Sequence, residues 1–258
     1  MNSNVLEKIF FLFLFLLLVY IISALYLYLT QNSKVFQRKY AKEYTPKYAK
    51  KLYFTTSDGK RLEGAYLENK KGAPLVLYFS GNANNVIEFI DNIAVNIKDY
   101  NFLGFNYPGY AGSEGEPCEE CILKYALEIF DKYKPQILIG RSLGTAVATY
   151  VAANRDVEKL VLITPFDSIE HIAQIRYPIL PISLLLKHKF KEVEWIKNVK
   201  APVSVLFVKN DDIIPQKSID NLLKHIPNLN KKIEIEGVTH GRIYEYPNIS
   251  KVIEELLK

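Results

Sequence analysis

The sequence contains few of the residues that bind metals or carry redox chemistry. Among its 258 residues are only two cysteines, four histidines, one methionine and one tryptophan. The cysteines, Cys118 and Cys121, form one C-x-x-C pair, and no second Cys/His pair at metal-ligand spacing accompanies them. Because a structural zinc ion normally takes four such ligands, we expect neither a bound metal nor a cofactor.

The C-x-x-C pair is interpreted as two ordinary cysteines at the start of a helix. Its surroundings, GEPCEECIL, are acidic, and nearby negative charge raises the pKa of a thiol instead of lowering it. A redox pair is the alternative interpretation. In an oxidising compartment Cys118 and Cys121 could also join as a disulfide.

Positive charge is scarce outside one short segment. The net charge is +5, and seven basic residues lie together at Lys34, Arg38, Lys39, Lys42, Lys47, Lys50 and Lys51. The rest of the chain is close to neutral, so we expect no nucleic-acid partner. Apolar residues make up 49% of the chain, which argues against disorder, and the length suits one large α/β domain.

No charged residue occurs between Lys8 and Lys34. The segment IFFLFLFLLLVYIISALYLYL covers residues 9–29, and about 20 apolar residues are enough to span a bilayer as a helix. A core helix is rarely apolar on every side for so long, and a signal peptide ends in a small-residue cleavage site that is missing here. The pattern predicts an uncleaved membrane anchor over residues 1–30.

The basic residues after this anchor favour a single-pass protein with its C-terminal domain in the cytoplasm. Five of them fall within the 20 residues after the span, against Lys8 before it, and cytoplasmic flanks carry the excess of Lys and Arg. The opposite orientation is the alternative. Residues 31–50 are predicted as a basic juxtamembrane linker, which is either a solvated tether or a segment lying on anionic headgroups.

From residue 51 onward, segments typical of strands and helices alternate. A hairpin is expected at Asp58-Gly59. Further strands are expected within 73–81, 100–107, 135–140, 158–164, 202–208 and 231–237, and helices within 85–97, 121–133, 144–154, 218–226 and 250–258. This alternation predicts an α/β domain over residues 51–258 with a mostly parallel sheet. Residues 165–200 break the rhythm and are predicted as a short helical insertion, or cap, over the site.

The sequence Gly140-Arg141-Ser142-Leu143-Gly144 stands between a predicted strand and a predicted helix. G-x-S-x-G in this setting is the nucleophile-elbow pattern, in which a strained turn exposes the serine hydroxyl and small neighbours are required. A serine that only caps a helix is the alternative. The context favours Ser142 as a nucleophile.

A nucleophilic serine requires a base and an acid that orients it. In this type of domain the order along the chain is Ser, then Asp or Glu, then His. Asp211 and Asp212 directly follow one late predicted strand, and His240 follows the last one. The remaining histidines, at 171, 188 and 225, lie in the insertion or near a helix end. The order therefore indicates Ser142, Asp211 or Asp212, and His240.

Backbone N–H groups that hold a developing oxyanion are expected from two loops. One is that of Leu143, at the N-terminus of the helix after Ser142. The other follows an early strand, where the sequence FSGNANN places Asn82 after Gly81. A plain turn between strand and helix is the alternative for this second loop.

Six segments in order resemble the α/β-hydrolase superfamily, and more closely its membrane-anchored BEM46/ABHD13-type branch. They are FSGNANN, FNYPGYAGSEGEP, GRSLGTAVA, TPFDSIEHIAQIRYPILPISLLLKHKF, VKNDDIIP and GVTHGRIYE. The resemblance covers residues 51–258. It implies Ser142 as nucleophile, His240 as base and Asp211 as acid, since Asp211 stands four residues before Pro215 as in the family's D-x-x-V-P ending.

The resemblance also implies oxyanion donors at Asn82 and Leu143. The sequence departs from the family in one respect, with Ser80-Gly81 where His-Gly is usual. Together these features predict a membrane-anchored serine hydrolase that cleaves an ester, thioester or amide. The anchor and the apolar insertion suggest acyl or lipid-like substrates, and an insertion that merely packs on the sheet is the alternative. A non-catalytic, membrane-tethered interaction module with the same fold is the alternative.

Overall fold

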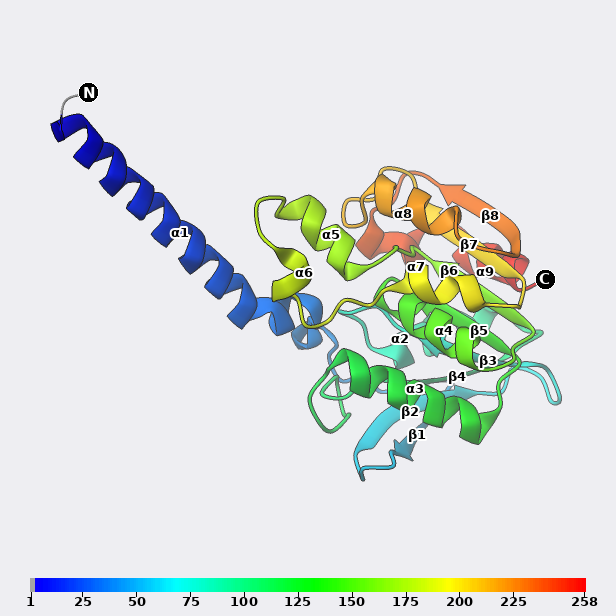
Figure 1. Cartoon of the computed structure of the whole chain (residues 1–258). Coiled ribbons are helices and arrows are strands. Elements are labelled where there is room, and N and C mark those ends of the chain that lie inside the picture. The colour runs from blue at the N-terminus through cyan, green and yellow to red at the C-terminus, as the bar shows by residue number, and fades with distance from the viewer. Residues whose placement is uncertain (1–2) are drawn as a thin grey trace.

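The chain after residue 50 folds around one eight-stranded sheet, seen in the computed structural model, which describes residues 3–258 (Figure 1). The strands are β1 Lys50–Thr55, β2 Arg61–Leu67, β3 Leu75–Phe79, β4 Asn101–Phe105, β5 Ile137–Arg141, β6 Lys159–Ile163, β7 Val203–Val208 and β8 Leu229–Ile235. Their order is β1-β2-β4-β3-β5-β6-β7-β8. The pairs β1–β2 and β2–β4 are antiparallel and all others are parallel, so the predicted mostly parallel sheet is confirmed.

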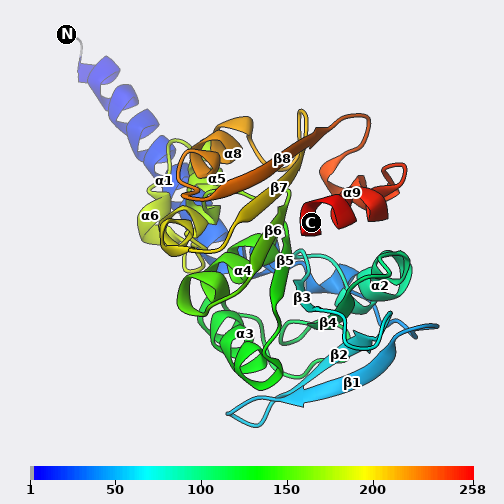
Figure 2. The same ribbon diagram turned by 90° about the vertical axis from the view of Figure 1, so that its right-hand side faces the viewer.

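Helices cover both faces of this sheet (Figure 2). The helices of the main body are α2 Val86–Asn92, α3 Glu119–Tyr133, α4 Leu143–Asn154, α8 Gln216–Leu223 and α9 Ile249–Leu257. Side chains from α3, α4 and α8 pack in one buried cluster, and those from α2 and α9 pack in a second cluster on the other face. The central strands, apolar on both faces, are therefore buried on both sides.

One predicted helix is shorter than the sequence indicated. The segment 85–97 forms α2 as far as Asn92 and continues as a short 3-10 helix at Ala94–Asn96. Asn85 caps α2 by accepting a hydrogen bond from the N–H of Ile87 at 2.9 Å. Apolar spacing alone does not distinguish the two helix types, because both bury the same side of the segment.

The insertion at residues 165–200 contains α5 Ile169–Arg176, α6 Ile182–Leu185 and α7 Glu192–Trp195. The first two helices and their connection lie on the side of the domain that α1 approaches (Figure 1). In contrast, α7 packs against α4. The predicted helical insertion thus divides into a projecting part, α5 and α6, and a part that belongs to the body.

The N-terminal segment forms a single helix, α1 Ser3–Val35, which projects away from the body (Figure 1). The stretch Asn4–Tyr40, which covers nearly all of α1, is the only one within residues 3–258 that is long and apolar enough to cross a membrane. It is the candidate transmembrane span. The first two residues of the predicted anchor, 1 and 2, lie outside the described residues.

The predicted linker at residues 31–50 is neither a free tether nor a separate segment. Its first residues continue α1 to Val35, and the side chains of Val35, Phe36 and Ala41 are buried in the larger of the two clusters. Farther along, the buried carboxylate of Asp91 on α2 accepts hydrogen bonds from the N–H groups of Lys47, Tyr48 and Ala49 at 2.7–2.9 Å. A prediction based on side-chain charge does not detect these contacts, because the backbone N–H groups of residues 47–49 form them.

Cys118 and Cys121 lie at the start of α3, as expected, but they are joined as a disulfide and are not free thiols. Residues three apart on the first helical turn face the same side, and their Cα atoms are 5.4 Å apart, within the usual range for a bridged pair. Cys118 also accepts a hydrogen bond from the N–H of Cys121. Both cysteines lie where the sequence predicted, and the disulfide, which the sequence left open, is present.

Candidate active site

Ser142 occupies a tight turn between β5 and α4. Its φ of 50° and ψ of −121° are strained for a residue with a side chain, and such strain is typical of functional turns. The turn is held because the N–H of Ser142 donates to the carbonyl of Ile163 at 2.8 Å. A Cβ atom on Gly140 would come within 2.3 Å of the Gly144 carbonyl oxygen, and one on Gly144 within 2.2 Å of the Phe79 carbonyl oxygen. Both glycines are required by close packing.

The imidazole of His240 bridges Ser142 and Asp211. Its Nε2 atom is 2.9 Å from the Ser142 hydroxyl oxygen, and its Nδ1 atom is 2.8 Å from Oδ2 of Asp211. Ser142 and His240 are both buried. The three side chains, separated by up to 98 residues in sequence, thus form a continuous hydrogen-bonded chain that contains a hydroxyl, an imidazole and a carboxylate.

The two adjacent aspartates, which chain order alone did not distinguish, make different contacts. Asp211 turns its other oxygen, Oδ1, to the N–H groups of Ile213 and Ile214, both at 2.8 Å. Burial alone would raise the pKa of Asp211, but the hydrogen bonds and charge of His240 and these N–H groups bring that pKa below its usual value. Asp212 instead accepts a hydrogen bond from the backbone N–H of His240 at 2.8 Å. Asp211 thus fixes the ring, and Asp212 fixes the loop that carries it.

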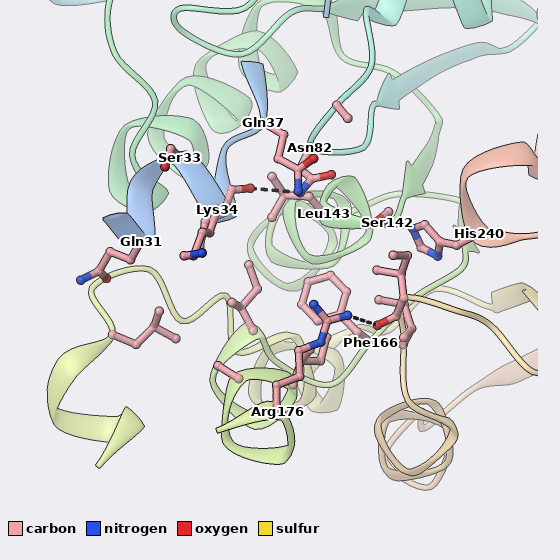
Figure 3. Close-up of a pocket in the computed structure, with 18 of the residues that line it drawn as sticks. Gln31, Ser33, Lys34, Gln37, Asn82, Ser142, Leu143, Phe166, Arg176 and His240 are labelled. Atoms are coloured by element: carbon pink, nitrogen blue, oxygen red, sulfur yellow. Dashed lines mark hydrogen bonds between the residues drawn. The ribbon is translucent and has the colours of Figure 1, made fainter. Parts of the chain in front are cut away.

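Asn82 and Leu143 both line the pocket beside Ser142 (Figure 3). Within residues 3–258 their backbone N–H groups have no hydrogen-bond partner. The loop of Asn82 is fixed from the N-terminal side of the chain: its carbonyl accepts from the N–H of Gln37 at 3.0 Å, and its side chain donates to the carbonyl of Val35 at 3.1 Å. The end of α1 therefore sets the position of this loop.

Arg141 is a site residue that the sequence analysis missed. This residue is buried, and its Nη2 atom donates to the carbonyl of His240 at 2.8 Å while Nη1 donates to the side chain of Asn84. The guanidinium also lies over the ring of Tyr244, 5.5 Å from its centroid. The signal in the sequence was a charged residue at the end of an otherwise apolar strand. The G-x-S-x-G pattern ignores this residue because Arg141 occupies its first x position.

A cavity of about 760 Å³ leads from Ser142 to the end of α1. Apolar side chains of α1, α5 and α6 line much of it, and Figure 3 shows Gln31, Lys34 and Arg176 across the pocket from His240. Three cationic residues of the lining, Lys34, Lys39 and Arg176, form no salt bridge with any carboxylate in residues 3–258. The pocket is thus apolar along its walls and positively charged.

The other histidines lie outside this constellation. His171 pairs with Asp167, His188 lies between Asn32 and the N–H of Glu119, and His225 bonds to the carbonyl of Asn221. Across the described part of the chain, residues 3–258, no group of three or more His, Cys, Asp or Glu side chains is arranged to hold a metal ion. Of the four histidines, only His240 is within hydrogen-bond distance of the Ser142 hydroxyl.

Comparison with known proteins places this geometry in a family. Residues 74–186 match the family model for the α/β hydrolase fold. The chain is 32% identical over 197 residues to an uncharacterised protein of Mycobacterium tuberculosis, covering 72% of this chain and 70% of that protein. It is 30% identical over 198 residues to an uncharacterised membrane protein of Saccharomyces cerevisiae, covering 71% of this chain and 70% of that protein.

Two further similarities carry functional names. The lysophosphatidylserine lipase ABHD12 of Xenopus tropicalis is 24% identical over 244 residues, which cover 78% of this chain and 62% of the lipase. The esterase Pf2001 of Pyrococcus furiosus superposes with a TM-score of 0.61 at 19% identity, covering 81% of this chain and 91% of the esterase. The fold and these relatives together define a hydrolase with an apolar N-terminal helix. The chain belongs to the α/β-hydrolase family, and the predicted resemblance is confirmed.

Proposed function

We propose that this protein is a membrane-anchored serine hydrolase that cleaves an ester, thioester or amide bond in an acyl substrate. The observation that carries the proposal is the hydrogen-bonded chain from Ser142 through His240 to Asp211. A hydroxyl is a weak nucleophile until a base removes its proton, and an oriented imidazole supplies that base. The lowered pKa of Asp211 keeps its carboxylate ionised beside the imidazole.

The proposed reaction has two halves. In the first, Ser142 Oγ attacks the acyl carbon and its proton passes to Nε2 of His240. The N–H groups of Asn82 and Leu143 stabilise the negative oxygen, and His240 then protonates the departing alcohol, thiol or amine. In the second half, His240 removes a proton from water, the hydroxide attacks the acyl-Ser142 ester, and the carboxylic acid leaves as the serine recovers its proton.

The lining of the cavity favours an acyl substrate that also carries a negative group. The walls offer apolar surface to an acyl chain, while Lys34, Lys39 and Arg176 supply positive charge that no carboxylate of residues 3–258 neutralises in a salt bridge. One relative is named a lysophosphatidylserine lipase, and that name is the precedent for extending the proposal to acylated amphiphiles. The apolar walls, the cationic residues and the name of this relative together favour lipid-like esters as substrates over small, fully soluble esters.

Labelling by a fluorophosphonate probe tests the nucleophile. Wild-type protein should be labelled and Ser142→Ala should not. Ser183→Ala, at a serine on α6 outside the pocket lining, should be labelled like the wild type. Esters of increasing acyl length then test the substrate class, with longer chains expected to give the higher kcat/KM. A folded wild type that is neither labelled nor active on any ester would support the non-catalytic membrane-tethered module instead.

We also propose that α1 crosses the membrane once. The basic residues after it favour a cytoplasmic hydrolase domain. Because disulfides persist in oxidising compartments, the redox state of Cys118 and Cys121 offers a measurement. The disulfide between Cys118 and Cys121 favours the opposite orientation from the basic residues, and thiol trapping in intact cells decides between them: reduced cysteines would place the domain in the cytoplasm, and a disulfide would assign it to the opposite face.

A further inference from the structure

The projecting part of the insertion exposes an uncharged, apolar segment. Between Arg176 and Lys187 the sequence reads YPILPISLLL, residues 177–186, with no charged residue. The side chains of Ile179 and Leu184 are 81% and 83% exposed, so two large apolar groups are left uncovered on the surface. Neither residue lines the cavity. We call residues 177–186 the cap tip.

The cap tip lies along the anchor helix. The hydroxyl of Tyr20 contacts the carbonyl of Ile179 at 3.4 Å, and Gln31 donates to the carbonyl of Leu185 at 3.1 Å. Gln31 also accepts from the N–H of Lys187 at 2.7 Å. Because a helix rises about 1.5 Å per residue, the contacts at Tyr20 and Gln31 are about 16 Å apart along α1. The cap tip therefore follows α1 for that distance toward its N-terminus.

These contacts fix the depth of the cap tip relative to the apolar span. Tyr20 lies nine residues inside the end of the apolar segment at Leu29, which corresponds to about 13 Å along the helix. A bilayer's hydrocarbon core is about 30 Å thick. When α1 spans a bilayer, the backbone at Ile179 is therefore carried below the headgroups of the leaflet on the domain's side.

Much of the backbone of the cap tip is hydrogen-bonded without water. Two of its residues are prolines, which have no N–H group, and the N–H groups of Leu180, Ile182 and Leu184 are bonded within the segment. From α1, the hydroxyl of Tyr20 and the side-chain amide of Gln31 donate hydrogen bonds to the carbonyl groups of Ile179 and Leu185. Unpaired backbone groups are costly in hydrocarbon, and here the anchor helix supplies partners for them.

We infer that the cap tip inserts into the same leaflet as α1, so that the active-site cavity opens within the membrane and not toward water. The cavity supports this directly, since its lining includes Leu27 of the apolar span together with Tyr177 and Leu185 of the cap tip. An acyl chain moves from the leaflet along this wall toward Ser142. Arg176 and Lys187, which bracket the cap tip, stand at the level of the headgroups.

Depth-dependent fluorescence tests the insertion independently of catalysis. In a Cys118→Ser/Cys121→Ser background, Ile179→Cys is labelled with an NBD fluorophore, and full-length protein is reconstituted into phosphatidylcholine vesicles. The emission should shift to the blue and be quenched by lipids brominated on their acyl chains. The matched control is Leu229→Cys at the start of β8, also an exposed apolar position, which should keep aqueous emission.

An Ile179 label with the same emission and quenching as the Leu229 label overturns the inference. So does a blue shift that vanishes on dilution of protein in lipid without any quenching, because a second copy of the chain would then cover the cap tip. Both results stand whether or not the protein is a hydrolase, so they are separable from failure of the proposed function.

Substitution of the cap tip tests the consequence for substrate entry. Ile179→Asp and Leu184→Asp place a charge where we expect hydrocarbon, and hydrolysis of a long-chain substrate embedded in vesicles should fall about tenfold or more. Hydrolysis of a short soluble ester should stay within about twofold of wild type, as should both activities of Leu229→Asp. Equal losses on both substrates, or no loss on either, would contradict lateral entry from the leaflet.

Discussion

At the scale of single residues, the candidate site depends on groups that hold His240 as much as on His240 itself. Asp211 contacts the ring, Asp212 the backbone N–H and Arg141 the backbone carbonyl. The histidine loop is therefore fixed on three sides. Displacement of a reacting group by about 1 Å can lower a rate about a hundredfold, so the loop contacts are expected to affect turnover.

The substitution Arg141→Met should impair catalysis without impairing binding. Methionine fills part of the buried volume but donates no hydrogen bond to His240 or Asn84. We expect kcat for a short ester to fall by about ten- to a hundredfold while KM changes little, because the loop that carries the base loses its support. Steady-state kinetics measures both constants. Arg242→Met, at an exposed arginine paired with Glu245, is the control and should behave as wild type; an unchanged kcat in Arg141→Met would refute the role.

The substitution Gly144→Ala should lower the stability of the folded protein. The added methyl group would lie 2.2 Å from a backbone oxygen of Phe79, which cannot move without disturbing β3. We expect a loss of about 1–3 kcal/mol in the free energy of unfolding, or failure to fold. Thermal or denaturant unfolding measures it. Gly241→Ala has no atom within 4 Å of the new methyl group, and equal stability of the two variants would contradict the argument.

At the scale of elements, α7 contacts α4, the helix that follows Ser142, through a buried carboxyl group. Glu192 lies within 2.7 Å of the Thr145 hydroxyl and 3.0 Å of the Thr149 hydroxyl, both on α4. Burial raises the pKa of Glu192 to about 8, although the hydrogen bonds from these threonines oppose the rise. The contact between α7 and α4 therefore holds a neutral carboxyl group at moderate pH.

Glu192 makes the stability of the fold sensitive to pH. Between its ordinary pKa of 4.5 and about 8, the folded protein binds a proton that the unfolded chain has lost. The free energy of unfolding therefore falls as pH rises through this range, by about 1.4 kcal/mol per pH unit from this group. Glu192→Gln, which is neutral at every pH, should remove that slope.

Thermal unfolding of wild type and Glu192→Gln at pH 5 and pH 8 checks this prediction. The stability of Glu192→Gln relative to wild type should be higher at pH 8 than at pH 5. Glu120→Gln on the exposed side of α3 should leave the pH dependence as it is. Parallel pH profiles for wild type and Glu192→Gln would rule out the buried carboxyl as the cause.

The sequence was sufficient for features that depend on local pattern and chain order. The strands and the turn at Ser142 follow from apolar runs bounded by glycine, and His240 follows from its place after the last strand. Asp211 and Asp212 are indistinguishable locally, since the side chain that meets the imidazole is set by a turn closed onto Ile213 and Ile214. Arg141 and the burial of Phe36 depend on partners more than 40 residues away, which no local pattern records.

At the scale of the whole molecule, the anchor, the cap tip and the cavity lie on one side. The cavity has cationic residues from two separate segments, Lys34 and Lys39 near the end of α1 and Arg176 at the end of α5. Charge that two segments bring together without internal carboxylate partners attracts an anion from outside. Such attraction is weakened by dissolved salt.

Salt should therefore weaken the enzyme's preference for anionic substrates. Between about 0.01 M and 1 M salt the screening length falls from about 30 Å to about 3 Å. We expect KM to rise several-fold for an anionic amphiphile and to change little for a zwitterionic one with the same acyl chain. The triple variant Lys34→Gln/Lys39→Gln/Arg176→Gln should lose the difference between the two substrates, and an equal salt effect on both would argue against charge recognition at the pocket.

The hydrogen bonds between Asn82 and the end of α1 determine at which residue an active truncated version of the protein can begin. A soluble version that begins at residue 51, the boundary that charge and hydropathy suggest, lacks Val35 and Gln37, whose backbone groups hold the Asn82 loop. It also leaves the apolar partners of Phe36 uncovered. A version that begins near Leu25 retains these contacts and discards most of the lipid-facing surface. For protein production and crystallisation, the useful start point therefore lies inside the membrane helix, and an inactive shorter fragment would say little about the enzyme.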